Sequence, residues 1–143
     1  MSQLLSLNLG GNEIDDISPL ATLSNLERLF LSSHKFDLTK ISGLNNLTKL
    51  SLIGCYIDDL SPLANLHGLI ELDLSWNKIT DLRPLENLTN LKTLYLENNR
   101  NLIDISPLAK LKKLERVNLF NTRVTDWSPV SHVRRVDGRP KNH

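Results

Sequence analysis

Residues 69–90 read LIELDLSWNKITDLRPLENLTN, and this stretch carries the pattern that decides the fold. Its first half alternates apolar and polar residues with a period of two, as in Leu72 and Leu74, which favours a short strand with one buried face. Its second half places apolar residues three apart, as in Leu82, Leu85 and Leu88, which is the period of a 3₁₀ turn. The stretch therefore predicts one strand followed by one short helical turn.

The same pattern fills most of the chain, in six repeats that begin at Leu4, Leu26, Leu47, Leu69, Leu91 and Leu114. We number repeat positions from the first leucine; positions 1, 4, 6, 11, 14, 17 and 20 are apolar in every repeat once a one-residue deletion in the second repeat and a one-residue insertion in the fifth are allowed for. A single coil of this kind cannot bury its leucines alone, whereas stacked coils bury them against one another. The sequence therefore predicts a solenoid of six repeats over residues 1–130, with a C-terminal cap and basic tail over residues 131–143.

The repeat L-x-x-L-x-L-x-x-N-x-I, followed by a segment close to D-L-S-P-L-x-x-L, resembles the leucine-rich repeat family, specifically the 22-residue type of bacterial internalins. The resemblance covers residues 4 to about 136. It implies a right-handed superhelix with a parallel β-sheet on the concave face and short 3₁₀ or helical turns on the convex face. It also implies that the concave face binds a protein, for example a host or cell-surface protein, and that the chain is secreted or on the cell surface.

Composition and charge exclude several other classes of protein. Leucine accounts for 31 of the 143 residues and charged residues for 23%, which is wrong for a disordered chain. The formal net charge of +1 gives no general attraction to nucleic acid, and no apolar run approaches the ~20 residues that span a bilayer. The start, Met1-Ser2-Gln3, lacks the features of a signal peptide, so the residues alone leave the compartment open.

Position 9 of each repeat, which we call the ladder position, holds Asn12, His34, Cys55, Asn77, Asn99 and Thr122. A buried side chain there can hydrogen-bond backbone groups that the turn after the strand leaves unpaired. We therefore predict a structural role for His34 and an inert buried thiol for Cys55. Because Cys55 is the only cysteine, the chain has no internal disulfide and no cysteine-built zinc site.

The turns of the convex face have two sequence signals. Serine precedes proline at Ser18, Ser61, Ser106 and Ser128, which predicts a helical turn capped by the serine hydroxyl. Acidic residues stand just before these turns, at Asp15, Asp16, Asp58, Asp59, Asp81, Asp104 and Asp126. Such a row can be read as a calcium site, but carboxylates that accept backbone N–H groups at the start of each turn are the better explanation, and we predict no metal.

The two ends of the stack differ. The positions where a further repeat needs leucine are Arg139 and Lys141, beside Gly138 and Pro140, so a strand cannot continue there. Trp127 is large enough to cover the last coil. At the other end the strand Leu4–Leu9 has nothing to cover it, which predicts a missing cap or neighbouring segment, or self-association through this edge.

Residues that could perform chemistry do not converge. The histidines, His34, His67, His132 and His143, are spread over the chain, and no phosphate loop, metalloprotease motif or nucleophile motif is present. The basic residues of the tail, Arg134, Arg135, Arg139 and Lys141, lack interleaved aromatics and favour a solvated cap over a nucleic-acid site. We therefore predict no enzyme activity, no catalytic residues and no cofactor.

Partner binding is predicted from the apolar residues that the core does not use. Phe30 and Tyr95 at position 5 and Ile53 and Phe120 at position 7 point away from the core onto the concave face. Exposed aromatics beside charged residues are typical of binding surfaces. The predicted partner-binding residues are Arg28, Phe30, Ile53, Asp73, Trp76, Tyr95, Glu97, Arg116 and Phe120.

The sequence thus predicts a non-enzymatic protein-interaction module that presents a rigid concave sheet to a macromolecular partner. Two alternatives stay open at this stage. One is an intracellular regulatory subunit, like the leucine-rich-repeat regulators of protein phosphatase. The other is an accessory domain of a larger surface protein or enzyme.

Overall fold

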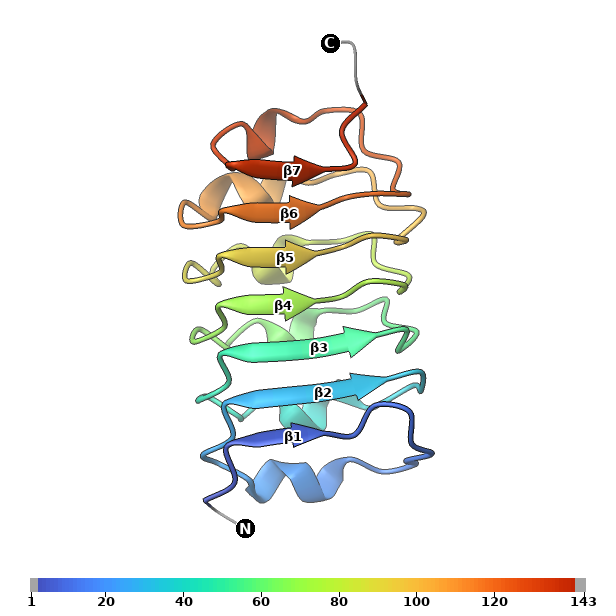
Figure 1. The fold of residues 1–143 in the computed structure, drawn as a ribbon, viewed down its shortest axis with the longest axis vertical. Helices are drawn as coiled ribbons and strands as arrows, with labels where there is room; N and C mark the ends of the chain where they lie inside the picture. Colours follow the sequence, from blue (N-terminus) through green and yellow to red (C-terminus); the bar gives the residue numbers. More distant parts are fainter. Residues whose placement is uncertain (1–2, 141–143) are drawn as a thin grey trace.

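The computed structural model describes residues 3–140, which form a stack of similar coils (Figure 1). Within these residues one sheet contains parallel strands in chain order: β1 (Ser6–Asn8), β2 (Arg28–Ser32), β3 (Lys49–Ile53), β4 (Glu71–Asp73), β5 (Thr93–Tyr95), β6 (Arg116–Asn118) and β7 (Arg135–Asp137). Behind it lie the 3₁₀ turns η1 (Ser18–Thr22), η2 (Leu38–Ile41), η3 (Ser61–Leu63), η4 (Arg83–Leu85), η5 (Ser106–Lys110) and η6 (Ser128–Val130). The predicted leucine-rich repeat solenoid is confirmed.

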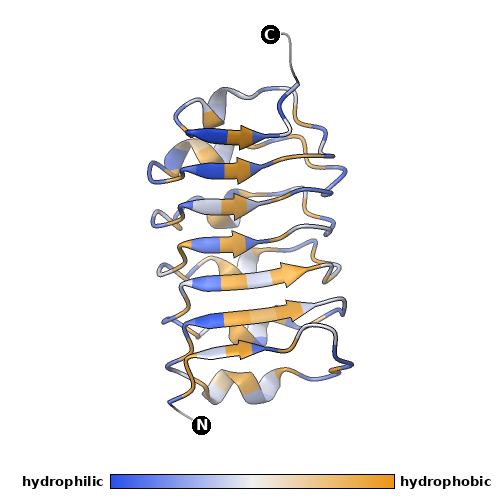
Figure 2. Cartoon of the chain, in the orientation of Figure 1, coloured by the Kyte–Doolittle hydropathy of each residue, from blue (hydrophilic) through white to orange (hydrophobic). Residues whose placement is uncertain are grey.

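The register of the sheet aligns equivalent repeat positions of successive coils. Leu29 pairs with Leu50, Leu50 with Leu72, and Leu72 with Leu94, so the position-4 leucines form one column. Figure 2 shows this column as an apolar band through the strands. The outward positions 3 and 5 flank it and form the concave face. A residue's repeat position therefore decides whether its side chain lies in the core or on this face.

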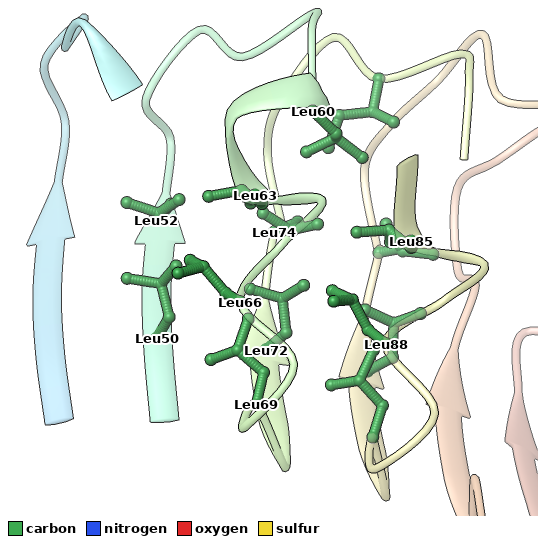
Figure 3. Packing of buried hydrophobic residues seen from close by; sticks show 14 of the residues in the cluster. Leu50, Leu52, Leu60, Leu63, Leu66, Leu69, Leu72, Leu74, Leu85 and Leu88 are labelled. Carbon is green, nitrogen blue, oxygen red and sulfur yellow. The ribbon is translucent and has the colours of Figure 1, made fainter. Parts of the chain in front are cut away.

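The core fills the space between the sheet and the 3₁₀ turns. In Figure 3 the leucines of β3 and β4 extend from the sheet toward those of η3, η4 and the segments that follow them. Leu50, Leu63, Leu66 and Leu72 have no exposed surface, and each such burial stabilises the fold by about 1.5–3 kcal/mol. Among residues 3–140 no helical segment is long and apolar enough to span a membrane.

The ladder position performs the predicted structural role. The buried Asn77 amide accepts hydrogen bonds from the backbone N–H groups of Cys55 and Ile57, each at 2.9 Å. Its Nδ2 donates to the carbonyls of Leu52, Leu74 and Ser75 at 2.9–3.1 Å. Asn99 makes three equivalent contacts one coil further on, with the Ile79 N–H and the carbonyls of Leu74 and Leu96. These side chains join consecutive coils at the point where the chain leaves the sheet.

The 3₁₀ turns begin differently from the prediction. No serine hydroxyl caps its turn, because each serine is itself the first residue of the 3₁₀ segment and its N–H is the group that needs a partner. The carboxylate two residues earlier accepts that N–H. The acceptors form an acidic row, Asp16, Asp37, Asp59, Asp81, Asp104 and Asp126, with N–Oδ distances of 2.8–3.1 Å. The predicted carboxylate role is therefore observed for Asp16, Asp59, Asp81, Asp104 and Asp126 but not for Asp15 or Asp58, and the predicted hydroxyl cap was wrong.

The ends of the stack also become defined. A further strand, β7, lies inside the segment predicted as the cap, and Leu119 N–H donates to the Asp137 carbonyl at 2.9 Å. The chain turns away at Gly138, which has φ +98° and lies so close to β6 that a Cβ there would sit 2.5 Å from Phe120 N. Lys141 and His143 lie outside the described residues. At the other end β1 pairs with β2 alone, and Leu5 is 45% exposed.

Candidate functional site

The concave face carries two similar clusters of side chains, each built across three neighbouring strands. In the first, the Lys49 ammonium of β3 lies 5.5 Å from the centroid of the Phe30 ring on β2. The same Lys49 Nζ lies 3.1 Å from a carboxylate oxygen of Glu71 on β4. A cation over an aromatic face is worth about 0.5–1 kcal/mol at an exposed site. Lys49 thus contacts both an aromatic ring and a carboxylate of neighbouring strands.

The second cluster repeats this arrangement three strands further on. The Arg116 guanidinium of β6 lies 5.3 Å from the centroid of the Tyr95 ring on β5. Arg116 Nε also lies 3.3 Å from Asp137 Oδ2 on β7, whose other carboxylate oxygen is 3.3 Å from Arg135 Nε. The order aromatic, cation, acid along the stack is therefore the same in both clusters. The predicted residues Phe30, Tyr95 and Arg116 lie in them.

Two further predicted residues add exposed apolar surface to this face. Ile53, at the end of β3, is 37% exposed, and Phe120, just after β6, is 54% exposed. Neither is required by the core, because the neighbouring Leu52 and Leu119 are the buried residues of their segments. Glu97 is half-buried and accepts a hydrogen bond from Asn118 Nδ2 at 3.3 Å. Arg28 is exposed and lies 3.7 Å from Glu27.

Asp73 lies on the concave face, but its carboxylate is used by its own chain. Asp73 Oδ1 accepts from Ser75 N–H at 3.0 Å and from Ser75 Oγ at 2.7 Å, which ends β4 after three residues. Asn8 and Asn118 accept the equivalent N–H groups in their coils. Asp73 is therefore a turn-forming residue first. Together with Ser51 and Thr93 it leaves a stretch of small side chains between the two clusters.

Trp76 lies at the edge of the sheet, away from the two clusters. It belongs to the turn after β4, is 56% exposed, and has a backbone φ of +60°. Beside it, Tyr56 is 55% exposed with φ +56°, and both line one hollow. The sequence prediction missed Tyr56. Tyr56 is a hydrophobic residue of the third repeat that occupies no core position, so the sequence did indicate that it is exposed.

The groups considered for chemistry are dispersed and structurally engaged. Burial raises the pKa of the Cys55 thiol to about 11, so it is protonated and unreactive at neutral pH. His34 is half-buried and packs against Phe36, with ring centroids 5.3 Å apart, while His132 Nε2 lies 2.8 Å from the Leu111 carbonyl oxygen. Within residues 3–140 no group of three or more histidine, cysteine or acidic side chains is placed to hold a metal ion.

The acidic row is likewise occupied by its own turns. Hydrogen bonds from the residue two positions later lower the pKa of every one of these six carboxyl groups. The effect is largest at Asp81, where the Arg83 side chain and backbone lower the pKa to about 2. A carboxylate that already accepts these donors has fewer lone pairs for a cation. The row therefore stabilises the turns.

Comparison with known proteins places this geometry in a family. Residues 67–110 and 89–132 match the family described as Leucine Rich repeats (2 copies). The crystal structure of internalin C2 from Listeria monocytogenes superposes with a TM-score of 0.84 at 36% identity, covering 92% of this chain and 60% of that one. Internalin F from the same organism gives 0.75 at 33% identity, covering 95% and 48%.

A more distant structure shares the fold alone. The leucine-rich repeat domain of APL1B superposes with a TM-score of 0.71 at 21% identity, covering 85% of this chain and 38% of that one. Comparison with curated proteins finds no match. The chain thus spans 60% of the internalin C2 chain and 48% of the internalin F chain, less than two thirds of either.

Proposed function

Because the chain is an internalin-like leucine-rich repeat protein, we propose that it is a non-enzymatic module that binds a protein partner on its concave face. The observation that carries this proposal is the pair of aromatic–cation–acid clusters around Phe30 and Tyr95. Aromatic and arginine side chains supply a large share of the binding energy in protein interfaces. Here they lie on the outward side of one hydrogen-bonded sheet.

The mechanism we propose is preorganisation. The sheet fixes the backbone of every outward side chain, and the cations of Lys49 and Arg116 restrict the Phe30 and Tyr95 rings. Ordering a rotamer-rich side chain at an interface costs about 0.5–1.5 kcal/mol, and folding has already met that cost here. The exposed Phe120 and Ile53 then supply apolar surface that a partner can bury.

A capture experiment with a matched control tests this proposal. The wild-type chain and a triple variant, Phe30→Ala, Tyr95→Ala and Phe120→Ala, are immobilised and exposed to the same protein mixture. The control is Ile103→Ala, because Ile103 is 53% exposed but lies outside the strands. We expect a protein that binds the wild type and the control and is absent from the triple variant. Equal capture by all three would contradict the assignment of the concave face.

A further inference from the structure

A row of five side chains, four of them basic, lies in the segments that follow the C-terminal ends of the strands. In each repeat we consider the residue directly after the ladder position: Lys35, Tyr56, Lys78, Arg100 and Arg123 in repeats two to six, which we call the edge row. All of these side chains are exposed. The Lys78 N–H donates to the Ile57 carbonyl and the Arg123 N–H to the Leu102 carbonyl, each at 2.8 Å. These two bonds join Lys78 and Arg123 to the preceding coil, in the segments that follow strands β4 and β6.

The four cations of the edge row have no acidic partner among residues 3–140. The ion pairs of the described residues involve other cations, such as Lys49 and Arg116 on the concave face. Lys78 lies 5.8 Å from the centroid of the Tyr56 ring, a contact that leaves its charge uncompensated. The formal net charge of the chain is only +1, so this concentration of positive charge is local. Such a row attracts an anionic partner.

An aromatic hollow lies in the middle of the edge row. Tyr56, Trp76, Lys78 and Arg100 contribute to its lining, and its volume is about 510 Å³. Both aromatic residues adopt the left-handed backbone conformation, at φ +56° and +60°. Ser33, Asn98 and Asn121 adopt the same conformation at the position of Trp76 in other repeats, so the turn itself requires it. Tyr56 and Trp76 are 55% and 56% exposed and are not needed by the core, so their rings are available to a ligand.

The polar groups of the hollow narrow the chemistry of that ligand. The Asn77 amide is fully used by the backbone of two coils, and Asn98 Oδ1 accepts from Asn121 Nδ2 at 2.8 Å. The lining contains no carboxylate. The cations of Lys78 and Arg100 supply hydrogen-bond donors but no acceptors, which favours an anionic ligand over a neutral sugar. A ligand with an apolar group for the rings and carboxylates for the flanking cations fits better.

We propose that the edge row binds an extended acidic segment of a protein, with one apolar or aromatic side chain seated between Tyr56 and Trp76. Carboxylates on either side of that chain pair with Lys78 and Arg100. Neighbouring strands lie ~4.8 Å apart, so the row from Lys35 to Arg123 spans roughly 19 Å, which is the length of about six extended residues. This surface lies at the edge of the sheet, separate from the two clusters, and the inference goes beyond the function proposed above.

Fluorescence anisotropy of a labelled synthetic peptide, in which glutamates flank one central phenylalanine, tests the inference on the whole chain. We expect saturable binding that weakens as salt rises, because the ion pairs are exposed. The double variant Lys78→Ala, Arg100→Ala should weaken binding about tenfold. Its matched control, Lys112→Ala, Lys113→Ala, removes the same charge from exposed residues outside the hollow and should change affinity by less than about twofold.

Further arms separate the apolar contact and the alternative ligands. Trp76→Asn removes the indole but keeps a residue type that tolerates this backbone, as at Asn98, and should also weaken binding. The concave-face variant Tyr95→Ala, Phe120→Ala should bind the peptide normally. Three results would each overturn the inference. The first is an equal loss of peptide affinity in Lys78→Ala, Arg100→Ala and in the control Lys112→Ala, Lys113→Ala. The others are unchanged binding of a peptide with glutamine in place of glutamate, and binding of a heparin fragment or single-stranded DNA in place of the peptide.

Discussion

At the scale of single residues, Asn77 shows how one side chain can hold two coils together. Its amide makes all of its hydrogen bonds to backbone groups that a turn leaves unpaired, and it is 7% exposed. Removing a side chain from such a network leaves buried donors and acceptors unsatisfied, each at a cost of about 1–3 kcal/mol. Asn12 occupies the same repeat position but is exposed, with contacts of 3.2 and 3.4 Å.

We therefore predict that Asn77→Ala lowers the free energy of unfolding by about 3 kcal/mol, whereas Asn12→Ala lowers it by less than about 0.5 kcal/mol. Urea denaturation followed by circular dichroism measures both values. Similar losses in the two variants would mean that the ladder position acts through residue type alone. The structure predicts instead that burial decides the size of the loss.

The ladder position could be predicted from the sequence, but the hollow of the edge row could not, and Trp76 and Tyr56 show why. Position 8 has positive φ in all six repeats and holds Gly11, Ser33, Gly54, Trp76, Asn98 and Asn121. Glycine and asparagine, which fill four of these positions, tolerate the left-handed region, so the pattern itself predicts that conformation. Trp76 at the same position was therefore recognisable as strained. That Trp76 and Tyr56 line one hollow depends on the direction of side chains in two coils, which the pattern does not contain.

At the scale of elements, the acidic row makes the stability of the 3₁₀ turns depend on pH. The pKa of each of its carboxyl groups is lowered on folding by hydrogen bonds from the turn, to about 2 at Asp81. A group with a lowered pKa contributes stability above its unfolded pKa, and this stability is lost as pH falls through the folded pKa. The relevant window therefore lies between about pH 4 and pH 2.

We predict that the urea midpoint is nearly constant from neutral pH to about pH 5 and falls steeply below about pH 4. Asp81→Asn should be less stable than the wild type at neutral pH because it loses the ion pair with Arg83. That difference should shrink toward pH 2, where the wild-type carboxyl is protonated as well. A difference that stays constant with pH would show that the carboxylate charge plays no part.

The last element of the described chain depends on a glycine. Gly138 turns the chain away from β7 at φ +98°, and a Cβ at this position would lie 2.5 Å from Phe120 N. Both the conformation and the close approach exclude a side chain. The sequence predicted that a strand cannot continue here, but β7 itself was not foreseen, because the segment 131–143 was read as a cap. Val136 had continued the apolar rhythm, which was the available signal.

We predict that Gly138→Ala lowers the free energy of unfolding by about 2 kcal/mol and loosens β7 first. Gly43→Ala is the control, since a Cβ at Gly43 meets no atom within 4 Å and should change stability by less than about 0.5 kcal/mol. Hydrogen exchange of the Leu119 amide, which donates to the Asp137 carbonyl, reports on β7 directly. Unchanged protection of this amide in Gly138→Ala would contradict the packing described for the end of the stack.

At the scale of the whole molecule, the repeat pattern decides which residues are committed to the fold. The buried leucines stack from coil to coil, and their positions follow from the sequence because a period of about 22 residues admits only one register. The candidate site was less accessible to such reasoning. Phe30 and Lys49 were recognisable as outward residues, yet their contact depends on rotamers that no periodicity specifies.

Substitutions of core residues and of concave-face residues should change different properties of the protein. Core and ladder residues determine stability, because their partners are other coils. The residues of the two clusters pair mainly with one another at the surface, where such contacts contribute little to folding. Tyr95 belongs to a cluster and Phe120 is 54% exposed, so both can be replaced with little effect on the fold. Their effect should be on association with a partner, because an aromatic anchor truncated to alanine typically costs 2 kcal/mol or more in binding, which is about thirtyfold in affinity.

The most direct test of the concave-face assignment is titration calorimetry of the captured partner against Tyr95→Ala, Phe120→Ala, with Ile103→Ala as the control and the melting temperature of each variant recorded in parallel. We predict that the double variant binds the partner about thirtyfold or more weakly while melting within a few degrees of the wild type. Wild-type affinity in the double variant would contradict it. So would a loss of affinity that appears only together with a large fall in melting temperature.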